Sequence, residues 1–178
     1  MERQEVRDFL AEHIPGIDSN AVPETRLDAM YTPLVPVVRD AEGVVIAAAL
    51  TCRSQVAAGA SMLRASANEY ATVLDKHSEL DLLAVAPHAR GRGLGTQIMN
   101  DLEGQLAQRG VRVWFGNVTH DQDAHRLRCF YSRLGFKVLD EGQRLPLLLG
   151  KEWMPPNLQP PAFFFYKQIR SLRQPSRW

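Results

Sequence analysis

A run of three glycines and two arginines, RGRGLGT at Arg90 to Thr96, constrains this chain more than any other feature. It follows an apolar segment that ends at Val85 and precedes a segment whose apolar residues recur every four positions, so it joins a predicted strand to a predicted helix. At a helix start, several backbone N–H groups lack an intrahelical partner, and the helix dipole adds partial positive charge. The glycines leave that backbone accessible and the arginines add charge, which predicts a site for a phosphate group. The residues expected to bind it are Arg90, Gly91, Arg92, Gly93, Leu94, Gly95 and Thr96.

The segments around this run alternate between helical and extended patterns. Helices are predicted over residues 2–13, 60–77, 93–110 and 123–135, and strands over 79–87, 111–119, 136–142 and 161–169. Residues 34–52 predict a hairpin that turns at Asp40 to Gly43, and a proline-rich loop is expected over 150–161. This order indicates one α/β domain over residues 1–169, with a mixed sheet and helices on its faces, followed by a polar tail over 170–178.

The composition argues against several classes of function. The chain has 178 residues, of which 45% are apolar, and its net charge of +1 gives no basic surplus for nucleic acid. The longest strongly apolar stretch, VVIAAAL, is far shorter than a membrane span, and the charged N-terminus MERQEVRDFL does not resemble a signal peptide. Cys52 and Cys129 are too few for a disulfide framework, so we expect two small apolar side chains in a reducing compartment. Together, these features predict a cytoplasmic protein that binds neither membrane nor nucleic acid. No Cys/His cluster predicts a metal site.

Two common phosphate-binding motifs do not fit the run. The nucleoside-triphosphate loop requires a lysine after its last glycine, and the dinucleotide fingerprint requires a G-x-G-x-x-G spacing that GRGLGT breaks. The arrangement that fits is R-x-x-G-x-G after a strand that ends in V-x-P; the residues are Val85, Pro87, Arg90, Gly93 and Gly95. Together with FYSRLGF at residues 130–136, in which a tyrosine lies four residues before a Gly-Phe pair, it resembles the two signatures of the GNAT-type N-acetyltransferase superfamily. The resemblance covers roughly residues 30–169.

The resemblance implies a GNAT-like fold, in which a mixed, mostly antiparallel sheet of six or seven strands is flanked by helices. It also implies that the strand before the loop carries a bulge, and that the strands at 79–86 and 111–118 splay apart to admit the pantetheine arm of acetyl-CoA, the implied acyl donor. Backbone groups of Leu83 and Val85 would pair with pantetheine, and the Val85 N–H would polarise the thioester carbonyl. The implied cofactor-binding residues of this strand are Leu83, Ala84 and Val85.

The same resemblance implies two catalytic side chains. Tyr131 matches the family tyrosine that protonates the departing thiolate, although an amphipathic helix could also use it as a core aromatic. Glu79, six residues before Val85, matches the general base of histone-acetylating relatives, and it alternates with Asp81 on one face of the strand. Asp81, His120 or a chain of waters could act as the base instead, and both carboxylates could belong to a solvated strand edge.

The chain departs from the family pattern at Ala124. The segments expected to bind the acceptor carry no comparably specific motif. Where the family often has an asparagine, seven residues before the tyrosine, this chain has Ala124; Asn117 is an alternative polar contact, and Asp121 or Asp123 is expected to cap the helix. By resemblance, the acceptor enters opposite acetyl-CoA, between residues 14–31, 54–77 and 150–161. Trp153, in the last segment, could help to wall a pocket, or that loop could pack on the sheet or support a homodimer.

The function implied by the resemblance is acetyl-CoA-dependent N-acetyl transfer. The acetyl group would move directly, in a ternary complex, to a primary amine of a small molecule or a protein. A protein that binds acyl-CoA without catalysis, as a sensor or scaffold, would carry the same loop. Release of coenzyme A thiol that depends on an added amine would separate the enzyme from the sensor.

Overall fold

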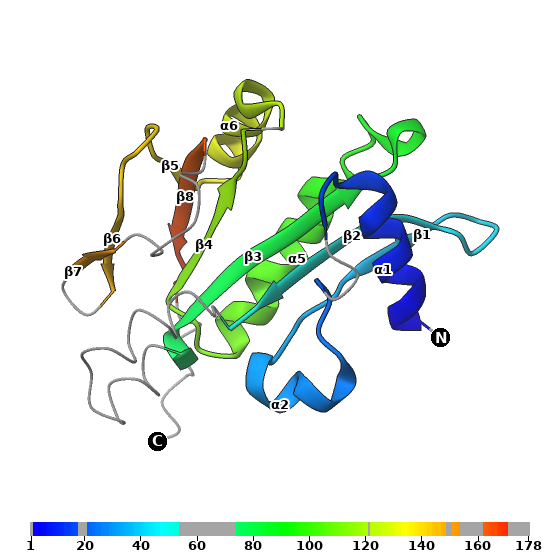
Figure 1. The fold of residues 1–178 in the computed structure, drawn as a ribbon, viewed down its shortest axis with the longest axis horizontal. Helices are drawn as coiled ribbons and strands as arrows, with labels where there is room; N and C mark the ends of the chain where they lie inside the picture. Colours follow the sequence, from blue (N-terminus) through cyan, green and yellow to red (C-terminus); the bar gives the residue numbers. More distant parts are fainter. Residues whose placement is uncertain are drawn as a thin grey trace, which may run out of the picture.

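A computed structural model describes residues 2–17, 21–53, 74–120, 122–148, 151–153 and 162–170 (Figure 1). The α-helices are α1 (Glu2–His13), α2 (Asp28–Tyr31), α5 (Leu94–Gln108) and α6 (Ala124–Arg133), and the 3-10 helices are η1 (Thr25–Leu27) and η2 (Pro87–Ala89). The strands are β1 (Val37–Arg39), β2 (Val45–Cys52), β3 (His77–Val85), β4 (Val113–Val118), β5 (Lys137–Val138), β6 (Leu145–Leu148), β7 (Lys151–Trp153) and β8 (Phe163–Gln168). Within these ranges, no helix combines the length and the apolar character that crossing a membrane requires.

The main sheet has six strands in the order β1-β2-β3-β4-β8-β5. The β3–β4 pair is parallel, and the other four pairs are antiparallel. β1 and β2 are joined by the predicted tight turn, in which the Gly43 N–H donates to the Asp40 carbonyl and Gly43 has a φ of 84°. The mostly antiparallel sheet flanked by helices is therefore confirmed.

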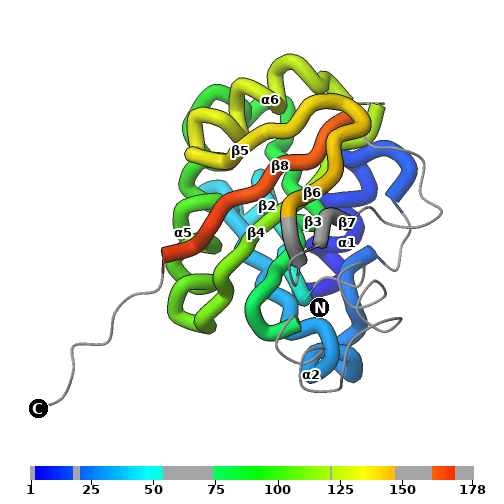
Figure 2. Tube along the Cα trace, turned by 90° about the vertical axis from the view of Figure 1, so that its left-hand side faces the viewer, coloured from blue at the N-terminus to red at the C-terminus, as the bar shows by residue number. Residues whose placement is uncertain are grey.

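Helices cover both faces of this sheet. α1 lies on one face and α5 on the other, as both views show (Figures 1 and 2). The apolar side of α1 packs in one cluster with Ile46, Ala48 and Leu50 of β2, whereas Ala47 and Ala49 belong to the cluster formed by α5 and α6. All eight residues of β2 are buried, which explains its uninterrupted apolar sequence.

The strand, loop and helix around the glycine run form as the sequence predicts. α5 begins after Gly93, whose φ of 81° is unfavourable for residues with a side chain, and Gly110 follows its last turn with a φ of 76°. The side chains that α5 buries against the sheet are Ile98, Met99, Leu102 and Leu106. The four-residue spacing therefore identified the core-facing side of this helix.

A short hairpin replaces part of the predicted proline-rich loop. Lys151–Trp153 forms β7, which pairs with β6 in a separate two-stranded sheet. β6 could not be predicted from the sequence because it contains Pro146, and proline is unfavourable inside strands. Leu145 packs with Phe115 and Phe164, which attaches β6 to the main sheet.

The predicted helix over 60–77 lies mostly outside the described residues. Residues 74–76 are helical, and β3 begins directly after them at His77, two residues earlier than predicted. Of the predicted polar tail over 170–178, Arg170 is described.

Candidate active site

The two halves of β3 are paired differently. On one side β3 pairs with β2 from Glu79 to Val85, whereas on the other side it pairs with β4 from His77 to Leu80. Beyond Leu80 and its partner Gly116, no further β3–β4 pair forms, although both strands continue. β3 and β4 diverge from their shared lower end in Figure 1, so the predicted splay between these strands is confirmed.

Asp81 lies at the point where both pairings change. Leu50 pairs with Leu82, and the next residue, Thr51, pairs with Leu80, so Asp81 is an extra residue in a β-bulge. Asp81 is therefore the one residue of β3 with a partner on neither neighbouring strand. A bulge of this kind re-aims the local side chain and interrupts the ladder, and it agrees with the bulge that the family resemblance implies.

The second half of β3 turns backbone groups toward the splay, and the Val85 carbonyl among them accepts a hydrogen bond from Arg90 Nε. The Ala86 N–H donates to the Ile46 carbonyl at 2.9 Å, so alternation along the strand turns the N–H of Ala84 toward β2 as well. The N–H and C=O groups of Leu83 and Val85 consequently face the side where β4 no longer pairs. An extended chain such as a pantetheine arm could bond to these groups as an added strand would.

The glycine run supplies a second set of free donors. The Arg90 N–H donates back into η2 and the Gln97 N–H donates to the Gly93 carbonyl at 3.0 Å; between them, the N–H groups of residues 91–96 have no acceptor within the described ranges. They lie at the N-terminus of the 15-residue α5, whose dipole is positive there. A Cβ at Gly91 or Gly93 would meet nothing within 4 Å, so the space above this backbone is open. Free amides, a helix N-terminus and open space together fit a diphosphate.

Two residues of the run, Arg90 and Gly95, make contacts that hold the structure around the loop, and a third, Arg92, lies outside the cavity lining. The Arg90 Nε donates to the Val85 carbonyl at 3.1 Å, which ties the loop to the end of β3. A Cβ at Gly95 would approach the Phe130 ring at 3.4 Å, so this glycine lets α5 and α6 pack closely. Arg92 is exposed and is not among the lining residues of the cavity described next, so its phosphate contact stays a prediction.

A cavity of about 580 Å³ joins the splay to the glycine run. Its walls come from β3, the loop, α5, β4, α6 and the segment after α1. The predicted residues that line it are Leu83, Ala84, Val85, Arg90, Gly91, Gly93, Leu94, Gly95, Thr96 and Tyr131. Asp81 and Asn117 also line it, whereas Glu79 is not among its lining residues. The candidate phosphate site and one candidate base therefore share a single space.

Tyr131 belongs to both the core and the cavity wall. Its side chain is buried, and its ring stacks on Phe165 with centroids 3.7 Å apart. Both readings of this tyrosine therefore fit its position, because it packs in the apolar cluster and also lines the cavity. Burial raises the pKa of Tyr131 above its ordinary value, so the hydroxyl remains protonated at neutral pH and can donate a proton.

Asp81 opens onto the cavity and is contacted from β2 by Cys52. The Cys52 thiol donates to the Asp81 Oδ2 at 3.0 Å. Partial removal from water, followed by the neighbouring charge of Glu79, raises the pKa of the Asp81 carboxyl above its ordinary value. The residue nevertheless remains exposed on the cavity side, whereas Glu79 is buried. A carboxylate with a raised pKa is a stronger proton acceptor than an ordinary one.

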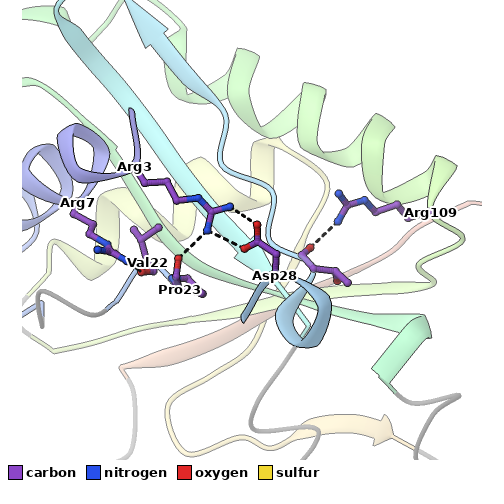
Figure 3. A network of polar contacts seen from close by, with 7 residues as sticks. Arg3, Arg7, Val22, Pro23, Asp28 and Arg109 are labelled. Carbon is purple, nitrogen blue, oxygen red and sulfur yellow. Dashed lines mark hydrogen bonds and ion pairs between the residues drawn. The ribbon is translucent and has the colours of Figure 1, made fainter. Parts of the chain in front are cut away.

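The segment after α1 forms another part of the cavity wall. Residues 13–17 line the cavity, and contacts at the other end of α1 hold the helix to the following chain (Figure 3). The Arg3 guanidinium bonds both Asp28 carboxylate oxygens, at 2.6 and 2.8 Å, and Arg7 donates to the Val22 carbonyl at 2.8 Å. These bonds hold Val22 and Asp28 against α1.

The remaining acceptor-side predictions are tested only in part. Residues 14–17 line the cavity, as expected for the segment 14–31. Residues 54–73 and 154–161 lie outside the described residues, and Trp153 is described as part of β7 by its backbone.

The structure places His120, an alternative base, and Asp123, a candidate helix cap. His120 Nε2 lies 3.7 Å from Glu141 Oε1 on the surface, and His120 is not among the residues that line the cavity. Asp123 caps α6 by accepting a hydrogen bond from the Arg126 N–H at 3.0 Å, as predicted. Ala124 begins this helix, so the polar contact that the family often places there is absent from its side chain.

Sequence reasoning missed two basic residues and misplaced a cysteine. Arg126 and Arg133 line the cavity from α6, and their seven-residue spacing, which places them on one helix face, is the signal that could have identified them. The expectation that Cys129 packs as a small apolar side chain is wrong, because this residue is exposed. Cys129 lies two positions from Tyr131, which turns it to the opposite side of the helix.

Comparison with known proteins agrees with this geometry. A family model described as "Acetyltransferase (GNAT) domain" matches residues 39–138, which include the bulged strand, the glycine run and Tyr131. No curated protein sequence matches the chain.

Several solved structures share the fold at low sequence identity. Tetrahymena GCN5 aligns with a TM-score of 0.59 and 12% identity over 93% of this chain and 85% of its own. The Escherichia coli ribosomal-protein-S18-alanine N-acetyltransferase has a TM-score of 0.56 and 16% identity over 100% of this chain and 95% of its own. The Escherichia coli GNAT family N-acetyltransferase YhbS, solved in complex with CoA, has a TM-score of 0.60 and 19% identity over 93% and 75% of the two chains. The splayed sheet, the open glycine loop and the family match agree, and the chain belongs to the GNAT acetyltransferase family.

Proposed function

We propose that this protein is an N-acetyltransferase that moves the acetyl group of acetyl-CoA to a primary amine within a ternary complex. One observation carries the proposal: a single cavity is lined by Gly91 and by residues 93–96 with their free amides, by the unpaired edge of β3 and by Asp81. The first of these features fits a diphosphate, the second fits an extended arm, and the third fits an amine that must lose a proton.

The chain holds the acyl donor through its backbone. The amides of residues 91–96 can bind the diphosphate, and the N–H and C=O groups of Leu83 can bind pantetheine. Acetyl-CoA supplies an acetyl thioester. The Val85 N–H then donates to the thioester carbonyl, and a preorganised donor of this kind contributes about 3 kcal/mol to lowering the barrier. Arg90 keeps the loop in register with this strand through the Val85 carbonyl.

Asp81 is our proposed general base. Asp81 first takes one proton from the acceptor ammonium. The freed amine then forms a C–N bond with the acetyl carbon while the C–S bond breaks. The second proton that the nitrogen loses replaces the one that the thiolate takes from Tyr131, and Asp81 releases its proton to solvent. Glu79, the residue favoured by the family resemblance, is buried beside the base and outside the cavity lining, where its charge strengthens the basicity of Asp81. A base that opens onto the cavity can meet the amine directly or through one water.

Tyr131 is our proposed general acid. The departing thiolate takes its proton, and the stack on Phe165 fixes the direction of the phenol ring. Burial raises the pKa of Tyr131, so the phenol carries its proton throughout the neutral range and is available to the thiolate. Each transferred acetyl group therefore leaves one free thiol and one amide.

A coupled assay tests the proposal. The protein is mixed with acetyl-CoA, a thiol reagent and a panel of primary amines, from small amines to amino-terminal peptides. Thiol release that depends on both the protein and an amine supports the enzyme. Heat of binding for coenzyme A at moderate ionic strength, with no amine-dependent release from any acceptor, would favour a sensor, and absence of both signals would refute both.

We also propose a reducing, cytoplasmic location. Cys52 and Cys129 are both free thiols in the structure, and exposed Cys129 would be prone to oxidation elsewhere. Labelling of Cys129 by a thiol reagent in freshly lysed cells, without prior reduction, is the expected result.

A further inference from the structure

We propose that Cys52 is a positioning residue that holds the Asp81 carboxylate in the cavity lining, where the carboxylate can meet the acceptor amine. The inference rests on the proposed role of Asp81 as base. It adds a residue from β2, a strand that carries none of the motifs that identify the family.

The bulge creates the need for such a contact. Asp81 has no partner on β2 or β4, so neither strand ladder fixes its backbone. The Cys52 thiol contacts Oδ2 at 3.0 Å, from a residue 29 positions away in sequence. This contact is the side-chain bond that ties the bulged residue to the neighbouring strand.

Cys52 is itself fixed by a buried set of hydroxyl bonds. The Ser78 Oγ donates to the Cys52 carbonyl at 3.0 Å, and the Thr51 Oγ1 donates to the Glu79 carbonyl at 2.5 Å. The Trp114 Nε1 in turn donates to Thr51 Oγ1 at 3.0 Å. These side chains come from β2, β3 and β4, so they fasten the three strands just before the splay.

The surroundings of the Cys52 thiol favour its protonated form, which can act only as a hydrogen-bond donor to Asp81. Burial, and then the negative charge of Asp81, raise the pKa of the Cys52 thiol, so it keeps its proton and acts as a donor. The negatively charged group that faces Asp81 from its own strand is Glu79. The other charged or titratable residues that line the cavity are His13 from α1, Arg90 from the loop, and Arg126, Tyr131 and Arg133 from α6. The thiol bond acts against burial and the charge of Glu79, because it favours the ionised form of the Asp81 carboxyl.

Two substitutions of Cys52 separate the effect of its hydrogen-bond donor from the effect of its side-chain volume. Cys52→Ser keeps a donor, whereas Cys52→Val fills the site with an apolar group that cannot donate. Cys129→Ser is the matched control, because Cys129 is exposed and does not line the cavity. The titration of Asp81 is followed by carboxyl-carbon NMR, with Asp81→Asn assigning the resonance, and thermal unfolding confirms that each variant is folded.

The expected result is an upward shift of the Asp81 titration by about 0.5–1 pH unit in Cys52→Val, since the charged form loses a hydrogen bond. Cys52→Ser and Cys129→Ser should titrate at or below the wild-type midpoint. In the acetyl-transfer assay, the acidic limb of kcat/KM should move upward by the same amount in Cys52→Val. An unchanged Asp81 titration in folded Cys52→Val would overturn the inference.

The NMR readout keeps this inference separate from the proposed function. A shifted titration in a protein without transferase activity would refute the enzyme while supporting the contact. Full activity of Asp81→Asn would refute the role of Asp81 as base, and with it the role of Cys52 in catalysis. An acidic limb that stays fixed while the titration moves would also overturn the catalytic role of Cys52.

Discussion

The two halves of β3 are built from one continuous strand and do different work. Residues 77–80 pair with β4, and Glu79 and Leu80 pair with β2 as well. The side chains of Ser78 and Glu79 are buried. Residues 82–85 pair on the β2 side alone, Asp81 pairs on neither side, and all five residues line the cavity. The change occurs at Asp81, where a single extra residue interrupts the ladder.

This contrast indicates how a sheet can carry a binding site without losing its core. The first half uses buried hydroxyl and indole groups to hold three strands together, so its polar groups serve stability. The second half leaves its backbone groups unpaired toward β4, so they are available to a ligand. Substitutions in the two halves should therefore separate stability from activity.

The largest expected effect is on turnover, in the open half. Asp81→Asn should lower kcat/KM by about 10²- to 10⁴-fold, because the amide cannot accept the proton of the amine. Steady-state kinetics with the best acceptor measures it. Glu79→Gln is the comparison, and it should affect turnover much less, since Glu79 does not line the cavity. A larger loss in Glu79→Gln than in Asp81→Asn would exchange the roles of the two carboxylates.

Tyr131→Phe should lower kcat by about 10²-fold while leaving the affinity for coenzyme A nearly unchanged, because the ring and its stack on Phe165 remain. Calorimetry and steady-state kinetics separate the two quantities. Equal turnover in the wild type and the variant would make Tyr131 a core aromatic alone.

In the paired half, Thr51→Val should destabilise the fold by about 1–3 kcal/mol, because it leaves the buried Trp114 Nε1 without its acceptor. The expected fall in Tm is about 2–12 °C for a chain of this size. Thr51→Ser, which keeps the hydroxyl, is the control and should lose less. Undiminished stability with lost activity would show that this network serves the site more than the core.

At the glycine run, Gly93→Ala should weaken binding of coenzyme A by about tenfold, since a side chain at positive φ costs about 1–2 kcal/mol and distorts the loop. Gly104→Ala is a matched control within α5, where a Cβ meets nothing within 4 Å. It should leave affinity unchanged and stabilise the helix by about 0.5–1 kcal/mol. Equal affinities in the two variants would contradict the diphosphate site.

The smallest expected effect is a pH dependence of stability. Because the pKa of Asp81 is raised in the folded state, folding retains a proton that the unfolded chain releases, so stability should fall as pH rises above about 4. The Tm of the wild type relative to Asp81→Asn should therefore decrease with rising pH. Asp101→Asn, at an exposed position of α5, controls for the loss of one acidic residue. A relative Tm that increases with pH would reverse the sign of the shift.

Several features followed from local sequence. The strand, glycine loop and helix at 79–110 were predictable because apolar periodicity and glycine placement act over a few residues. Tyr131 could be placed on the core-facing side of α6 for the same reason. The hairpin of β6 and β7 could not, because its strands are short and one contains a proline.

The sequence by itself determined the strand, glycine loop and helix over residues 79–110 and indicated where a phosphate could bind, because spacing and glycine conformation are local properties. Only the tertiary structure decided which carboxylate opens onto the cavity. Alternation treats Glu79 and Asp81 alike, but the register between Leu50 and Thr51 creates the bulge that exposes one and buries the other. The contact between Cys52 and Asp81 likewise exists because two strands distant in sequence pair in that register, and pairing between distant segments is set by packing of the whole sheet.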